Sequence, residues 1–147
     1  ISVSLPLLNR LATLRNFNYI KDSGGDMVIH QSYLRSGFKV LNGADPTAVY
    51  AFMAGACGAI WGAANFMPHA CVKLWNLVQQ QRHTEALTLW QTMLPSLLII
   101  WNDRYVPTVV RAAQLRGFGT GRVRRPLRPL SAAEDAALHT ALQTLQA

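Results

Sequence analysis

Short apolar segments alternate with helical patterns through the first half of the chain, and this alternation restricts the fold more than any other feature. The expected strands are residues 17–21, 38–42 and 58–64, and the expected helices are residues 5–14, 27–35, 47–56 and 68–81. The strands recur at intervals of about twenty residues, which favours a parallel sheet with right-handed crossover helices. The fold class is therefore α/β.

Residues that start and stop helices stand at the ends of these segments. Asp26 and Asp45 are expected N-caps, Pro46 fits the first position of a helix, and Gly37 closes the helix before the second strand. From His83 onward the strand patterns stop. Three further helical patterns follow, at residues 84–101, 105–116 and 132–145. We expect strand-bearing units followed by a helical region.

The stretch from Pro46 to Val72 contains no Asp, Glu, Lys or Arg and is long enough to cross a bilayer. Three glycines, an asparagine and a proline interrupt it, at Gly55, Gly58, Gly62, Asn65 and Pro68. Buried parallel strands also give continuous apolar runs, because helices cover the sheet. We expect part of a globular core here and no membrane span.

The net charge of +7 raises the question of nucleic acid, since the arginines are densest at residues 122–128. This run has no interleaved aromatics, so we favour a solvated or interface-forming tail and expect no nucleic-acid partner.

Cys57 and Cys71 are expected as buried free thiols in a reducing, cytoplasmic compartment, and no secretion leader is expected. The four histidines lack metal-ligand spacing and are expected at surface or helix-end positions (His30, His69, His83 and His139).

Lys21 is the residue with the sharpest chemical interpretation. It ends an expected strand and is followed by a turn, which is where parallel α/β folds place catalytic groups. Apolar surroundings disfavour the ammonium form of a lysine, and the neutral amine can attack a ketone to form an imine. A surface lysine paired with Asp22 or Asp26 explains the segment equally well. The following 23–25 segment is expected to be a tight turn in preference to a phosphate cradle.

Four segments in order resemble motifs of the dihydrodipicolinate synthase / N-acetylneuraminate lyase superfamily. They are the lysine motif at 20–26, the next strand at 40–45, a Gly-x-x-Gly to Ala-Asn strand at 55–65, and an Arg-x-Pro-Leu-x-Pro element at 124–130. The resemblance covers essentially the whole chain. It implies a (β/α)8 TIM barrel, of which this chain supplies the C-terminal half, about strands six to eight. Residues 1–82 would belong to the barrel, and residues 83–147 to a C-terminal helical region packed on it.

The resemblance also implies class I aldolase chemistry on pyruvate or a related 2-oxo acid, with no metal or organic cofactor. Lys21 would form the Schiff base, Gly43 would line the substrate pocket, and Ile60 would present its carbonyl oxygen to the lysine and bound substrate. The implied assembly is a homodimer or homotetramer. The activity would be most like that of 4-hydroxy-tetrahydrodipicolinate synthase. Alternatives are a paralogue that cleaves or dehydrates a sugar acid, such as N-acetylneuraminate lyase, and, more distantly, a non-catalytic homologue or a membrane-associated basic protein.

The chain also departs from that family. The family's proton-relaying tyrosine and its carboxylate-binding hydroxyl residues lie on strands before the lysine strand, and only twenty residues precede Lys21 here. Tyr19 shares the strand face of Lys21 but does not match that tyrosine. We therefore expect the chain by itself to be incomplete for catalysis. Trp61 stands where many members carry a small hydroxyl residue, and alternation leaves open whether it faces the pocket or the helices.

Overall fold

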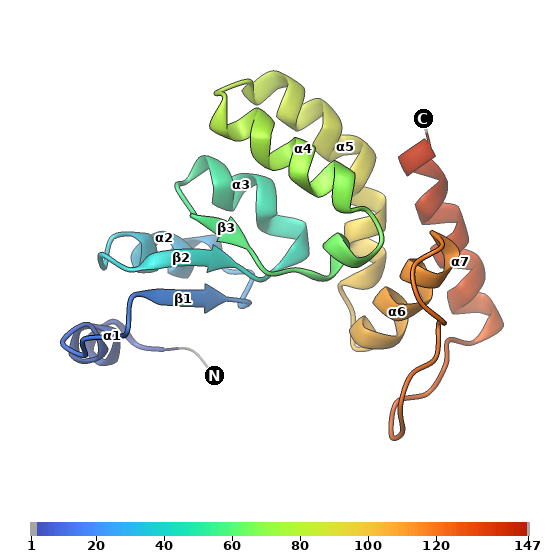
Figure 1. Ribbon diagram of the computed structural model, residues 1–147, viewed down its shortest axis with the longest axis horizontal. Helices are drawn as coiled ribbons and strands as arrows, with labels where there is room; N and C mark the ends of the chain where they lie inside the picture. Colours follow the sequence, from blue (N-terminus) through green and yellow to red (C-terminus); the bar gives the residue numbers. More distant parts are fainter. Residues whose placement is uncertain (1–2, 147) are drawn as a thin grey trace. The chain divides into compact units, whose positions relative to one another are not determined.

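The computed structural model describes residues 3–146 and divides into two compact units, residues 1–61 and 62–147. Each unit is described by itself. Figure 1 labels the helices and strands of both. The predicted division at residue 82, between the barrel half and the C-terminal helical region, is a different boundary and stays a prediction.

The first unit carries a three-stranded sheet, in which the strands lie in the order β1-β2-β3 and both pairings are parallel. Its arrows point the same way in Figure 1. The elements are α1 (Leu5–Leu11), β1 (Tyr19–Asp22), α2 (Met27–Leu34), β2 (Lys39–Asn42), the 3-10 turn η1 (Asp45–Thr47), α3 (Ala48–Met53) and β3 (Gly58–Ala59). The predicted parallel α/β arrangement is confirmed for this part of the chain.

Apolar side chains on one face of the sheet build the core of this unit. Val40 of β2 is buried, and Ile20 beside it in the register is partly buried. They pack in one cluster with side chains of the flanking helices (Leu8, Tyr33, Phe38, Leu11, Ile29 and Leu34). Successive strand residues point to opposite faces. The opposite face therefore carries Lys21 and Leu41.

Asp26 is the N-cap of α2, as predicted. Its carboxylate accepts hydrogen bonds from the backbone N–H groups of Val28, at 2.8 Å, and Ile29, at 3.2 Å. These bonds satisfy two of the donors that a helix start leaves free. The turn after Lys21 is thereby joined to a firmly capped helix.

The prediction that Asp45 caps the next helix is wrong. Asp45 is fully buried and begins η1, and α3 starts only at Ala48 without a side-chain cap. The chain turns here because the carbonyl oxygen of Ala44 accepts hydrogen bonds from the Asn42 amide, at 2.8 Å, and the Thr47 hydroxyl, at 3.0 Å. These side-chain hydrogen bonds hold a turn, so the helix begins later than predicted. Hydrophobic periodicity does not predict such bonds.

The third strand is shorter than predicted, because only Gly58 and Ala59 pair with β2. Residues Gly62–Asn65 form the 3-10 turn η2 at the start of the second unit. The N–H of Gly62 donates instead to the Tyr105 hydroxyl, at 2.7 Å. A distant side chain thus takes a donor that a longer strand would use.

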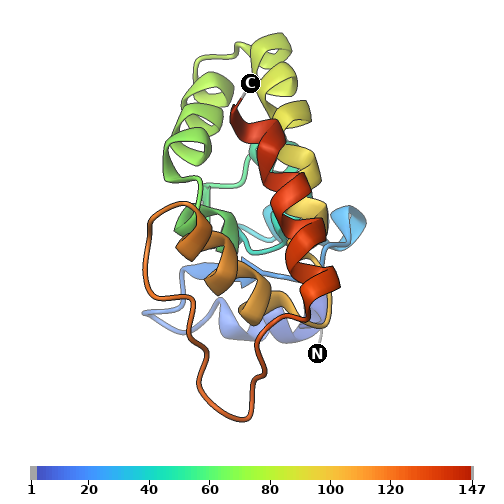
Figure 2. The same ribbon diagram turned by 90° about the vertical axis from the view of Figure 1, so that its right-hand side faces the viewer.

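The second unit is helical, as predicted for the region from residue 83 onward. It comprises η2, α4 (Pro68–Gln79), α5 (His83–Ile100), α6 (Tyr105–Leu115), α7 (Ala132–Gln143) and η3 (Thr144–Gln146). In Figure 2 the yellow α5 and red α7 lie side by side. The Ser96 hydroxyl of α5 donates to the Ala141 carbonyl oxygen of α7, and the Thr144 hydroxyl of η3 donates to the Thr92 carbonyl oxygen of α5, each at 3.0 Å. Large buried side chains fill the core (Leu74, Trp90, Met93, Leu97, Ile100 and Leu138).

The uncharged stretch from Pro46 to Val72 is divided among the end of η1, α3, β3, η2 and the start of α4. Within residues 3–146, no helix combines the length and the apolar character that a bilayer crossing requires. Cys71 is buried, as predicted, whereas the prediction for Cys57 is wrong. Cys57 is exposed because it directly precedes β3, the edge strand of the sheet.

An ion pair between α6 and α7 makes the stability of the second unit depend on pH. Arg111 donates to both carboxylate oxygens of Asp135, at 2.6 and 3.0 Å, and lowers the pKa of that carboxyl. A lowered folded-state pKa contributes stability above the unfolded value, near pH 4, and this contribution is lost as pH falls through the folded-state pKa. Both side chains are 30% exposed, so the effect is modest.

We therefore expect Asp135→Asn to lower the urea midpoint at pH 7 and to lower it less at pH 3. At pH 3, below the ordinary carboxyl pKa of about 4, the unfolded wild-type chain takes up a proton that the folded ion pair resists, so the contribution that the variant lacks is already smaller. Urea unfolding of both proteins at the two pH values measures this. An equal difference at both pH values would contradict the assignment of the ion pair.

Candidate active site

The three residues predicted for the site lie along one edge of the sheet. The register pairs Asp22 with Asn42 and Asn42 with Ala59, so the strands reach their carboxyl ends together. Backbone hydrogen bonds continue past the strands, from Gly43 N–H to the Asp22 carbonyl oxygen, at 2.7 Å, and from Ile60 N–H to the Asn42 carbonyl oxygen, at 2.8 Å. Lys21, Gly43 and Ile60 are thus side by side at the edge where parallel α/β proteins place their sites.

Lys21 lies directly over Gly43. A β-carbon built on Gly43 would overlap Lys21 Cε and would lie 3.1 Å from Lys21 Cγ. Gly43 is itself buried, so a side chain at this position would displace the lysine. The absence of a side chain at residue 43 is therefore what allows the lysine to cross the end of β2.

The same β-carbon would also overlap Ser23 Oγ. The Ser23 hydroxyl and the Lys21 side chain therefore converge on one point above Gly43. The sequence predicted only a tight turn at 23–25, and no role for Ser23. Ser23 and Gly43 meet because the ends of β1 and β2 lie side by side. A motif made of neighbouring residues in the sequence does not predict such a contact.

Behind the lysine, Asp22 points to the opposite side of β1 and is buried, whereas Lys21 is exposed. One carboxylate oxygen of Asp22 accepts from Gly24 N–H, at 2.9 Å, and the other lies 2.8 Å from His30 Nδ1. His30 was expected at a surface or helix-end position. It lies in the first turn of α2, but it is not at the surface, because only 1% of this residue is exposed. His69, His83 and His139 are exposed, as predicted.

Trp61 faces the helix side of the first unit and not the lysine. Its ring meets Phe52 of α3 edge to face, with centroids 6.0 Å apart. Ile60, one residue earlier, is 52% exposed. Trp61 is therefore a packing residue in this unit, and its size does not restrict the space around Lys21.

The lysine face of the sheet is open within the described residues. Tyr19 is 54% exposed, and its hydroxyl accepts from Lys39 Nζ at 3.4 Å, towards the amino end of the strands. Tyr19 thus has a partner away from Lys21, which agrees with its mismatch to the proton-relaying tyrosine. Lys21 is exposed, so the side chains of this unit do not enclose it in the apolar walls that were expected.

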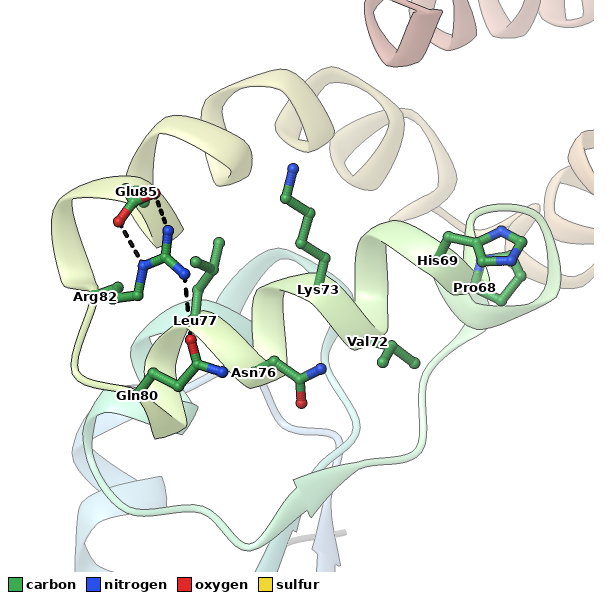
Figure 3. A pocket seen from close by; sticks show the side chains of 9 residues that line it. All are labelled: Pro68, His69, Val72, Lys73, Asn76, Leu77, Gln80, Arg82 and Glu85. Carbon is green, nitrogen blue, oxygen red and sulfur yellow. Dashed lines mark hydrogen bonds and ion pairs between the residues drawn. The ribbon is translucent and has the colours of Figure 1, made fainter.

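Two grooves among the described residues are lined by residues other than Lys21, Gly43 and Ile60. In the first unit, a groove of about 430 Å³ borders the amino ends of β1 and β2. In the second unit, a groove of about 530 Å³ runs along α4. Figure 3 shows His69 at one end of it, Lys73 in the middle, and Arg82 bonded to Glu85 and Gln80 at the other. All nine lining residues belong to the second unit, so the groove includes none of the three predicted site residues.

Among residues 3–146, no three His, Cys, Asp or Glu side chains lie close enough together to hold a metal ion. The groups gathered at the carboxyl edge are an amine, a hydroxyl and backbone N–H and C=O groups. Such a set can bind a carbonyl compound, and the amine can attack it once deprotonated.

Parallel pairing and intervening helices define the first unit as an α/β structure, and Lys21 at the carboxyl ends of its strands is the candidate centre of a site. The chain belongs to the dihydrodipicolinate synthetase family, whose model matches residues 1–145.

Similar proteins carry related names. The 4-hydroxy-tetrahydrodipicolinate synthase of Methanococcoides burtonii is 27% identical over 147 residues, which is 97% of this chain and 50% of that protein. The enzyme of the same name from Cellvibrio japonicus is 30% identical over 91% of this chain and 47% of its own length. YagE from E. coli K12, a member of the dihydrodipicolinic acid synthase family solved in complex with pyruvate, is 26% identical, with a TM-score of 0.88 over 97% of this chain and 51% of its own. The chain spans about half the length of these relatives.

Proposed function

We propose that the protein carrying this chain is a Schiff-base-forming lyase or aldolase that acts on pyruvate or a related 2-oxo acid. Its reaction would be most like that of 4-hydroxy-tetrahydrodipicolinate synthase. The observation that carries the proposal is the placement of Lys21 over Gly43 at the carboxyl edge of a parallel sheet. Relatives named for this synthase and a related structure holding pyruvate support the substrate class.

The chemistry follows from the amine. The neutral Nζ of Lys21 attacks the ketone carbon of the 2-oxo acid to give a carbinolamine, and uptake of one proton with loss of water leaves a protonated imine. This cation draws electrons from the adjacent carbon, so a proton leaves C3 and an enamine forms. The enamine carbon then attacks an aldehyde, and hydrolysis of the new imine frees the lysine. In the cleavage direction the same steps run in reverse.

Two neighbours of Lys21 would assist these steps. The Ser23 hydroxyl converges with the lysine over Gly43, where it can donate to or accept from the forming carbinolamine oxygen. The carbonyl oxygen of Ile60 would face the lysine and the bound substrate from the end of β3. Gly43 leaves room for the substrate as well as the lysine.

The remaining parts of the machinery would come from outside these 147 residues. We propose that the chain forms strands six to eight of a (β/α)8 barrel with its C-terminal helices. Earlier strands would then supply the tyrosine, the carboxylate-binding hydroxyls and the apolar wall over Lys21. The exposed lysine face and the two edge strands, β1 and β3, are consistent with this arrangement. A cytoplasmic homodimer or homotetramer is part of the same proposal.

Inactivation by borohydride tests the function. We expect the complete protein to lose activity when borohydride and pyruvate are added together, because hydride reduces the imine to a stable secondary amine. Neither reagent alone should inactivate it, and a non-ketonic acid such as lactate serves as the matched control for pyruvate. Equal inactivation with lactate, or none with pyruvate, would reject the imine mechanism.

A further inference from the structure

A buried carboxylate–imidazole pair stands directly behind Lys21. Asp22 is 9% exposed and His30 is 1% exposed, and Asp22 Oδ2 lies 2.8 Å from His30 Nδ1. The two side chains join the end of β1 to the first turn of α2. The pair involves the residue next to the lysine in the chain, on the opposite face of the strand.

The bonding of this pair determines which imidazole nitrogen carries the hydrogen. A carboxylate oxygen accepts, so the contact of 2.8 Å places a hydrogen of His30 on Nδ1. The other ring nitrogen, Nε2, is buried and has no hydrogen-bond partner among the described residues.

The carboxylate also controls the turn that follows the lysine. Asp22 Oδ1 accepts from Gly24 N–H at 2.9 Å, which fixes the path of the chain through Ser23. A β-carbon on Gly24 would lie 3.2 Å from the same oxygen, so the turn fits closely against it. Ser23 therefore lies between Asp22 and Gly24, which are joined by this hydrogen bond. Its hydroxyl lies near the Lys21 side chain over Gly43.

We propose that His30 is a positioning residue for the imine-forming lysine, a role that rests on the proposed function. His30 donates to the Asp22 carboxylate, and this second bond keeps the carboxylate aligned on Gly24 N–H. The turn then holds the Ser23 hydroxyl beside Lys21. His30 does not touch the substrate; it acts through Asp22 and the turn.

Two polar substitutions separate this role from general packing. Asn at position 30 places an amide donor near the position of Nδ1, whereas Gln extends its amide to the position of Nε2. Tyr33→Phe is the matched control, because Tyr33 is a buried residue of the same helix whose hydroxyl donates to the Val3 carbonyl oxygen, at 2.9 Å.

The rate of imine formation is measured in the complete protein by mixing with pyruvate and quenching with borohydride at successive times. We expect His30→Gln to slow adduct formation about tenfold, because small displacements of reacting groups cost large factors in rate. His30→Asn should stay within about threefold of wild type, and Tyr33→Phe should match wild type. Circular dichroism at the assay temperature checks that each variant is folded.

Equal rates for His30→Gln and His30→Asn, whether slow or unchanged, would overturn the positioning role. Slowing by Tyr33→Phe to the level of His30→Gln would also overturn it, because any loosening of α2 would then suffice. A wild-type protein that forms no adduct would reject the proposed function itself, and the positioning role with it. Adduct formation by wild type together with equal variant rates would reject the positioning role alone.

Discussion

Replacing Lys21 with arginine should abolish imine trapping and lower turnover by roughly a thousandfold or more. Arginine keeps the positive charge and a comparable length, but its guanidinium stays protonated and has no lone pair to attack a ketone. Lys21 is exposed at the strand end, so arginine meets little steric resistance there. The loss would therefore be chemical and not a loss of fold.

Lys39→Arg is the matched control for this experiment. Lys39 is an exposed lysine on the neighbouring strand, at the amino end, where its Nζ donates to the Tyr19 hydroxyl. We expect this variant to trap pyruvate as wild type does. Trapping by Lys21→Arg at the wild-type level, or its loss in Lys39→Arg, would show that the nucleophile is a different residue.

Gly43→Ala should lower the rate of imine formation about a hundredfold while leaving the unfolding free energy nearly unchanged. The added methyl would overlap Lys21 Cε and Ser23 Oγ, so both side chains must leave their present positions. Both are flexible and can move at small energetic cost, which protects the fold but not the geometry of the amine. Trapping rates and urea unfolding of the same preparation measure the two effects.

Gly37→Ala is the matched control, and we expect it to lower stability without slowing imine formation. Gly37 has a φ of +86°, which disfavours any residue with a β-carbon, yet an added β-carbon there would meet no atom within 4 Å. We expect it to lose about 1–2 kcal/mol of stability and to trap pyruvate at the wild-type rate. Loss of stability without loss of trapping in Gly43→Ala would contradict the account of residue 43.

Much of the first unit follows from local sequence. Apolar runs ending in polar turn residues predicted β1 and β2 and their parallel pairing, and Asp26 predicted the start of α2. These signals depend on residues a few positions apart, so a single sequence contains them. The helices after residue 83 were predictable for the same reason.

The errors share a different cause. The N–H of Gly62 bonds to Tyr105, 43 residues further along the chain, and the buried His30 contacts Asp22 in the preceding strand. The role of Gly43 was inferred from resemblance, whereas its contact with Ser23 required the register of β1 and β2. Contacts between residues far apart in the sequence produce no regular spacing of apolar or polar residues, so periodicity and spacing could not predict them.

Peptide mapping of the borohydride-reduced protein tests the central claim most directly. The complete protein is incubated with pyruvate, reduced, digested and analysed by tandem mass spectrometry. The account predicts one reduced pyruvyl group on Nζ of Lys21 and none on Lys39 or Lys73. An adduct on another lysine, or an unmodified Lys21 in a protein that turns over pyruvate, would contradict it.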